Sequence, residues 1–115
     1  CEYYALEGLT ALMDTMERVQ ESYNPELELQ GIVRTMYDSR NRLSVEVSQQ
    51  LISHFGDKVY DSVIPRNVTL AEAPSYGRPI LYYAPSSRGA YAYADLAAEI
   101  LEREERELKS LRVKK

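Results

Sequence analysis

The sequence has no tryptophan, one phenylalanine and a single cysteine in 115 residues. With Cys1 alone the chain can form neither an internal disulfide nor a multi-cysteine metal site, and a reducing compartment is compatible with it. It contains no run of about 18 apolar residues, and it does not start with a basic stretch followed by an apolar one. We therefore expect a cytoplasmic protein without a membrane partner, a catalytic cysteine or a metal site.

The composition is that of an ordinary globular domain, with 44% hydrophobic and 28% charged residues. The net charge of −4 is spread unevenly: residues 1–33 carry seven acids against one base, whereas residues 34–88 carry seven bases against five acids. A basic middle is a weak indication of nucleic-acid binding. A solvated surface explains the same asymmetry.

The first half of the chain alternates between helical and extended patterns. Apolar residues at spacings of three and four predict a helix over 5–23, which Asn24-Pro25 would end. The β-branched run 31–36 predicts a buried strand. A second helix is expected over 43–55, closed by Gly56, and a second strand over 59–64, stopped by Pro65.

The second half is predicted to be more irregular before a final helix. Thr69 and Glu72 have capping-box spacing, which predicts a short helical turn, and 80–83 is expected to be briefly extended. Ser86-Ser87 should cap a last helix whose charged tail covers 102–115. Its expected inner face comprises Ala90, Ala94, Ala97, Ile100 and Leu101.

This order predicts an α/β fold with a partial doubly wound parallel sheet and flanking helices. Two or three strands make a small parallel sheet, and the chain opens on a helix without an initiating Met. We therefore interpret residues 1–115 as a single-domain fragment of a larger domain. An exposed sheet edge would favour self-association of such a fragment.

Four segments resemble one family in that family's order. They are Cys1 to Leu9 (CEYYALEGL), Thr35 to Arg40 (TMYDSR), Val63 to Pro79 (VIPRNVTLAEAPSYGRP) and Ser87 to Ala90 (SRGA). The chain resembles the C-terminal half of ParA/Soj-type chromosome- and plasmid-partitioning ATPases, which belong to the deviant Walker P-loop superfamily. The resemblance implies the C-terminal portion of a P-loop NTPase fold.

The phosphate-binding loop of that superfamily is missing from these residues, since no Gly-Lys-Ser or Gly-Lys-Thr run occurs in them. Such a loop holds phosphate through successive backbone N–H groups, with a lysine and a magnesium ion neutralising the charge. We expect ATP and Mg²⁺ to be cofactors of the full-length parent. The isolated chain is expected to bind neither and to lack ATPase activity.

The resemblance also implies an adenine site at the carboxyl ends of the two strands. Met36 and Pro65 would flank the base, and Asn67 would hydrogen-bond it. This location agrees with the general rule that ligands of open α/β sheets bind outside the carboxyl ends of strands. On the residues alone, Pro65 is equally a strand stop and Asn67 a turn residue or helix cap.

Five arginines in predicted loops are candidates for contacts with DNA phosphates, because basic residues in this half of the family bind DNA without reading its sequence. They are Arg40, Arg42, Arg66, Arg78 and Arg88. Arg40 is the strongest candidate, although it could instead anchor its loop by pairing with Asp38. Thr69 departs from relatives such as Soj, which often carry arginine there.

By resemblance, the parent would be a nucleoid-associated DNA-segregation ATPase. Its partners would be a second copy in an ATP-dependent dimer, non-specific DNA and a ParB-type protein. One alternative is a MinD-like division-site ATPase, but 101–115 shows alternating charges and no aromatic wedge for a membrane. Another is a stand-alone receiver-like interaction module, which would need acids at the end of a strand before the first helix.

Overall fold

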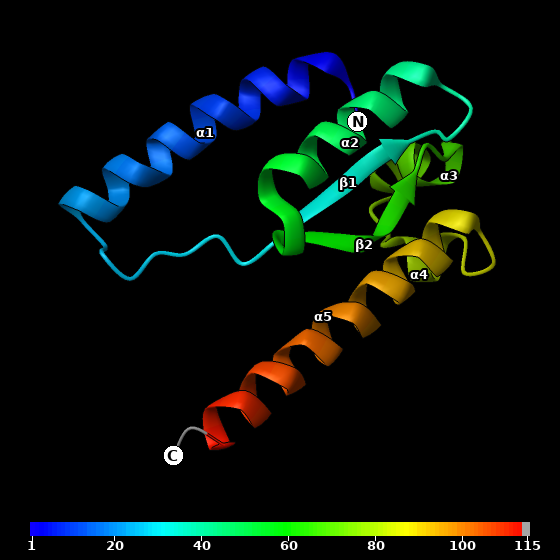
Figure 1. Ribbon diagram of the computed structural model, residues 1–115. Coiled ribbons are helices and arrows are strands. Elements are labelled where there is room, and N and C mark those ends of the chain that lie inside the picture. The colour runs from blue at the N-terminus through cyan, green and yellow to red at the C-terminus, as the bar shows by residue number, and fades with distance from the viewer. Residues whose placement is uncertain (114–115) are drawn as a thin grey trace.

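The computed structural model describes residues 1–113, and the chain alternates between helices and strands as predicted (Figure 1). The elements are α1 (Tyr3–Ser22), β1 (Ile32–Tyr37), α2 (Arg42–Phe55), β2 (Val59–Pro65), α3 (Val68–Glu72), α4 (Ile80–Tyr83) and α5 (Arg88–Val113). Short 3₁₀ turns at Gly56–Lys58 and Ala73–Tyr76 join α2 to β2 and α3 to α4. Of the predicted charged tail 102–115, residues 102–113 are helical, and residues 114–115 lie outside the described part of the chain.

The two strands form a parallel sheet with helices on both faces. One core cluster joins α2 to the sheet through Val47, Leu51 and Val59, with α1 packed against it. The other joins α5 to the sheet through Tyr60, Ile64 and Leu96. The side chains of the successive strand residues Val59 and Tyr60 thus pack on opposite faces of the sheet, as the pleat requires. The predicted α/β class, with a parallel sheet and flanking helices, is confirmed.

Two irregularities interrupt the pairing of β1 and β2. From the pair Ile32 and Val59 to the pair Arg34 and Val63, β1 advances two residues and β2 advances four. From there to the pair Tyr37 and Pro65, β1 advances three residues and β2 advances two. In this second interval β1 has two residues, Thr35 and Met36, opposite the single residue Ile64 of β2. Met36 has a φ of 53°, which is uncommon for a residue other than glycine. Bulges of this kind redirect side chains near functional sites.

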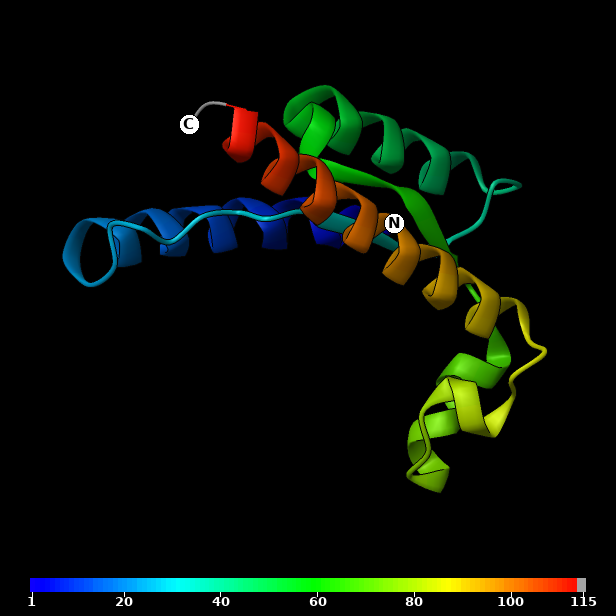
Figure 2. The same cartoon turned by 90° about the horizontal axis from the view of Figure 1, so that it is seen from below.

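The segment containing α3 and α4 forms a lobe that projects beyond the carboxyl end of the sheet (Figure 2). It meets α5 at Gly89, where a Cβ atom would lie 2.4 Å from Cγ of Leu70. Glycine is therefore required at this contact by close approach. Within the lobe, the Tyr76 and Tyr83 rings stack with centroids 5.0 Å apart.

Two local predictions in the lobe are wrong. The helical turn over 69–72 exists, but Asn67 caps it and Thr69 lies inside the helix. Residues 80–83 are helical rather than extended, because Pro79 precedes the first turn and its carbonyl accepts the N–H groups of Tyr82 and Tyr83 at 3.0 Å. A proline just before a helix fits its fixed φ and missing donor.

The last helix is capped as predicted, since Oγ of Ser87 accepts the Ala90 N–H at 3.1 Å. Its inner face is only partly the expected one. Ala90 is buried and Ile100 is half-buried, but Ala94, Ala97 and Leu101 are exposed, and the central buried residue is Leu96. Among residues 1–113, no helix is both long enough and apolar enough to cross a membrane.

Candidate functional site

The carboxyl ends of both strands open into one depression, with a volume of about 820 Å³. Its lining comes from the end of β1, the end of β2 and the first turns of α5. The polar and aromatic lining residues include Tyr37, Asp38, Arg40, Arg66, Arg88, Tyr91 and Asp95, with Pro65 beside them. This is the edge at which open α/β sheets bind ligands.

Three of the five candidate arginines meet at this depression: Arg40, Arg66 and Arg88. The other two do not line it. Arg42 is the first residue of α2, 3.9 Å from the Glu46 carboxylate, and Arg78 lies in the projecting lobe. The prediction that all five lie in loops is wrong for Arg42 and Arg88, because each begins a helix.

Arg40 makes the loop-anchoring contact with Asp38. Its Nε lies 3.2 Å from Oδ1 of Asp38, and its backbone N–H donates to the same oxygen at 3.0 Å. These hydrogen bonds from the side chain and then the backbone of Arg40 lower the pKa of Asp38. The Arg40 side chain is nevertheless 90% exposed, so its guanidinium can still meet a ligand.

Arg66 connects the end of β2 with the start of α1. Its Nη2 donates to Oε1 of Glu2 at 2.7 Å, and both side chains are more than half exposed. An exposed ion pair of this kind contributes about 0–1 kcal/mol to stability. Arg66 is therefore held in place by a contact that a competing anion can replace.

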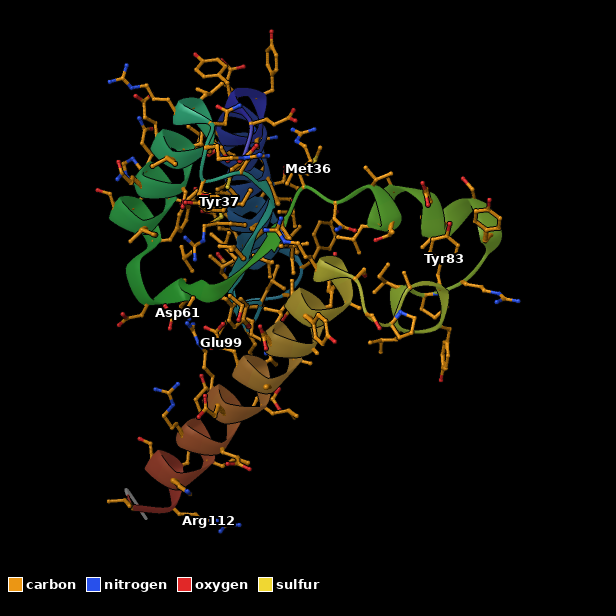
Figure 3. The ribbon with its side chains drawn as sticks, turned by 90° about the vertical axis from the view of Figure 1, so that its right-hand side faces the viewer. Met36, Tyr37, Asp61, Tyr83, Glu99 and Arg112 are labelled. Carbon is orange, nitrogen blue, oxygen red and sulfur yellow. The ribbon has the colours of Figure 1, made fainter. Side chains whose placement is uncertain are left out.

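The three adenine candidates lie near the same edge but do not line one cavity. Pro65 borders the depression, whereas Met36 borders a second hollow of about 290 Å³ with Tyr3, Tyr4 and Leu43. Figure 3 shows Met36 at the side of the sheet from which the lobe projects. Asn67 lines neither hollow, and its Oδ1 accepts the Leu70 N–H at 3.3 Å. The helix-cap interpretation of Asn67 is thus what the geometry shows.

Sequence reasoning missed a group of charged residues that hold the irregular part of β2. On the α5 side, the Glu99 carboxylate accepts the N–H groups of Asp61 and Ser62 at 2.7 and 2.8 Å (Figure 3). Arg103, one turn further along α5, donates to Glu99 at 2.8 Å and to the carbonyls of Asp57 and Val59. The spacing of four between Glu99 and Arg103 was the available signal.

Arg34 holds the same segment of β2 from β1. Its guanidinium donates to the carbonyls of Tyr60 and Asp61 at 2.8 and 3.0 Å, and to Ser48 on α2 at 2.9 Å. Side chains therefore satisfy backbone groups where β2 has two more residues than β1 between the paired positions. An arginine inside a β-branched run was the sequence signal for this role.

The electrostatics of Glu99 follow from these contacts. Desolvation by burial raises the pKa of Glu99. The hydrogen bonds from Ser62 and Asp61 and the charge of Arg103 lower it by more, so the pKa lies below its ordinary value. In the lobe, donation of the Tyr83 hydroxyl to Glu72 at 2.8 Å raises the pKa of Tyr83 to about 12.

The side chains at this edge differ in character: apolar residues lie at both strand ends, and arginines line the depression beside them. Met36 and Pro65 offer apolar surface at adjacent strand ends, and Asn67 offers an amide. Within residues 1–113 no three His, Cys, Asp or Glu side chains form a cluster that could hold a metal ion. As the sequence showed, no Gly-Lys-Ser/Thr loop occurs among the 115 residues to receive a triphosphate.

Comparison with known proteins assigns the chain to a family. Residues 4–80 match the family model described as the CobQ/CobB/MinD/ParA nucleotide binding domain. Because this match covers more than half of the chain, the chain belongs to that family. The predicted P-loop NTPase fold class is confirmed by the same match.

Three relatives sharpen the assignment. The chain is 59% identical over 104 residues to the chromosome partitioning protein ParA of Caulobacter vibrioides, which covers 90% of this chain and 39% of that protein. It is 55% identical over 102 residues to the chromosome-partitioning ATPase Soj of Thermus thermophilus, covering 89% of this chain and 41% of the relative. It is 52% identical over 100 residues to the sporulation initiation inhibitor protein Soj of Bacillus subtilis, covering 87% and 40%.

These matches confirm the resemblance to ParA and Soj proteins. The family description covers MinD as well as ParA, but the relatives above are ParA and Soj proteins, so the MinD-like alternative is less supported. Membership of a nucleotide-binding family also disfavours a receiver-like module. The chain spans about 40% of the length of the curated relatives that it matches.

Proposed function

We propose that this chain is the DNA-facing and base-facing part of a ParA/Soj-type DNA-segregation ATPase. The observation that supports this most is the depression at the carboxyl edge, where Arg40, Arg66 and Arg88 come together. Clustered cations bind a phosphate backbone without reading bases. The names of the relatives, chromosome partitioning protein and chromosome-partitioning ATPase, agree with this role.

In this proposal the cofactors ATP and Mg²⁺ are bound jointly with a phosphate-binding loop that is not among these 115 residues. Met36, Pro65 and Asn67 hold the adenine, and the triphosphate and metal are held elsewhere. ATP promotes a dimer of the whole protein, the dimer binds nucleoid DNA in the cytoplasm, and a ParB-type partner stimulates its release. Residues 1–115 then act as one part of a larger domain and do not hydrolyse ATP alone.

The test uses a chimera in which this chain replaces the matching segment of the Caulobacter vibrioides relative. In this chimera, Arg40→Glu should weaken ATP-dependent binding to unrelated DNA duplexes about equally, because a phosphate contact carries no base information. Loss of about one phosphate contact per subunit should flatten the plot of log affinity against log salt by about one unit. ATP-analogue binding should be unchanged.

Arg78→Glu is the matched control, since it makes the same charge change outside the depression. It should lower DNA affinity less than Arg40→Glu does, with little change in salt dependence. Equal effects of the two variants would show that the depression is not the DNA surface. Parallel loss of nucleotide and DNA binding in Arg40→Glu would mean that Arg40 serves mainly to anchor the Asp38 loop.

A further inference from the structure

Among the hydrogen bonds of residues 1–113, the side-chain amide of Asn67 is engaged through its oxygen and not through its nitrogen. Its Oδ1 accepts the Leu70 backbone N–H at 3.3 Å and also the hydroxyl hydrogen of Thr69. An amide oxygen has two lone pairs, and both are engaged by these contacts. A backbone N–H can only donate, so the oxygen must face it and the nitrogen must face away.

The Nδ2 group of Asn67 therefore remains as its available functional end. No hydrogen-bond partner for Nδ2 occurs within residues 1–113, and Nδ2 is not among the buried polar atoms that lack a partner. Asn67 follows Pro65-Arg66 directly, so this group lies just beyond the carboxyl end of β2. It offers two N–H donors and no acceptor.

We infer that Thr69 restricts Asn67 to hydrogen-bond donation, so that this position recognises a purine through a ring nitrogen and not through its 6-amino group. The inference rests on the proposed nucleotide site and specifies its chemistry. The ring nitrogens of adenine accept hydrogen bonds, whereas the 6-amino group donates and needs an acceptor. Asn67 could supply that acceptor only if Oδ1 kept a lone pair, and the Thr69 hydroxyl takes it.

Thr69 is a positioning residue in this arrangement because it acts on the base through Asn67. The Leu70 N–H alone would fix which way the amide faces but would leave one lone pair of the oxygen free. An asparagine in that state could bind an adenine through both ends, as a donor to a ring nitrogen and an acceptor from the amino group. Thr69 thus decides whether the amino group contributes to affinity.

The experiment compares ATP with purine riboside triphosphate, which lacks the 6-amino group but keeps every ring nitrogen. Affinities are measured in the chimera by competition with a fluorescent ATP analogue. In the unaltered chimera the two nucleotides should bind within about three-fold of each other. Thr69→Val removes the hydroxyl at similar volume and should make ATP bind about five-fold tighter than the analogue, the usual worth of one hydrogen bond.

Two further variants separate the possible causes. Thr69→Ser keeps the hydroxyl and should retain the nucleotide ratio of the unaltered chimera. Asn67→Asp keeps an oxygen for the helix cap but has no N–H, so it should preserve the unfolding midpoint and weaken ATP about ten-fold or more. A binding defect with intact stability is not expected from a purely structural role.

Each outcome has a distinct meaning. If Asn67→Asp leaves ATP affinity unchanged, the proposed adenine site is wrong. Weaker ATP binding by Asn67→Asp would support the adenine site. If the unaltered chimera nevertheless strongly prefers ATP over the analogue, and Thr69→Val does not alter that preference, the proposed role of Thr69 is overturned. If the chimera binds no ATP, the same variants are compared in the 115-residue chain by NMR titration with adenosine and purine riboside, where the same ratios are expected.

Discussion

Arginine–carboxylate pairs occur in two regions of this molecule and differ in their surroundings. Along the outer side of β2, Arg103 and Glu99 are 25% and 11% exposed and bond four backbone groups of the segment 57–62. At the carboxyl edge, the Arg66 and Glu2 side chains are 57% and 55% exposed, and within residues 1–113 neither side chain hydrogen-bonds a backbone group. The same chemistry therefore holds the fold in one region and leaves charge accessible in the other.

The physical reason for this difference is desolvation. A buried pair is costly to separate, because a lone charge would remain among unsatisfied backbone groups. An exposed pair exchanges its partner for water or another anion at little cost. The comparison therefore predicts large effects on stability in the first region and modest effects on binding in the second.

The largest effect is expected from Glu99→Ala. This change removes the acceptor of two strand N–H groups and the partner of Arg103, so the free energy of unfolding should fall by about 2–4 kcal/mol. Urea unfolding at neutral pH measures it. Glu102→Ala is the matched control on the exposed side of α5 and should change stability by no more than about 0.5 kcal/mol. Equal losses in both variants would contradict the structural role of Glu99.

A smaller loss is expected at the contact between α5 and the lobe. Gly89→Ala would place a Cβ 2.4 Å from Cγ of Leu70, so the lobe or the helix must shift. Overpacking of this kind costs about 1–3 kcal/mol, and thermal unfolding measures it. Adding Leu70→Ala should recover part of the loss, since it removes the obstructing side chain. A double variant less stable than the sum of the two single changes would argue against this close approach.

Acid should weaken the Glu99 contacts selectively. Because the folded-state pKa of Glu99 lies below its ordinary value of 4.5, its contribution is complete above that value and is lost as the pH falls through the lower folded-state pKa. The stability difference between the unaltered chain and Glu99→Gln should therefore shrink below about pH 4.5. Denaturant unfolding over a pH series measures this trend. A difference that stays constant down to pH 3 would exclude titration of Glu99 as its source.

The smallest effect is expected at the exposed pair. In the chimera, Glu2→Gln should release Arg66 and strengthen DNA binding up to about five-fold, consistent with an exposed pair worth at most about 1 kcal/mol. Glu7→Gln makes the same charge change on α1 away from Arg66 and controls for net charge. In a background carrying Arg66→Gln, the two glutamine variants should behave alike. A gain from Glu2→Gln that persists there would show that Arg66 does not mediate it.

Regular elements with strong local patterns were predictable. The apolar spacing of α1 and α2, the β-branched run of β1 and the capping by Ser87 all followed from interactions within a few residues. The adenine and DNA candidates came from the family resemblance, and the structure brings together Arg40, Arg66 and Arg88 but not Arg42 or Arg78. Their roles remain predictions.

The errors have two physical origins: short local contacts that the residue pattern did not reveal, and packing between elements that are distant in sequence. Thr69 had the spacing of a cap, but the side chain of Asn67, two residues beyond the end of β2, accepts the Leu70 N–H instead. The alanines of α5 had the right spacing for an inner face, but packing against Tyr60 and Ile64 selected Leu96. Four residues at 80–83 were too few to show any periodicity.

By itself, the sequence determined the order of helices and strands, the parallel α/β class and the placement of chemistry-bearing residues after each strand, because these follow from local pattern and chain connectivity. Tertiary structure alone decided the two breaks in strand register, the exposure of the Met36 side chain, and the contacts by which Arg34, Glu99 and Arg103 hold β2. Those features depend on which backbone groups are left without partners once the elements pack, and side chains from other elements then satisfy them.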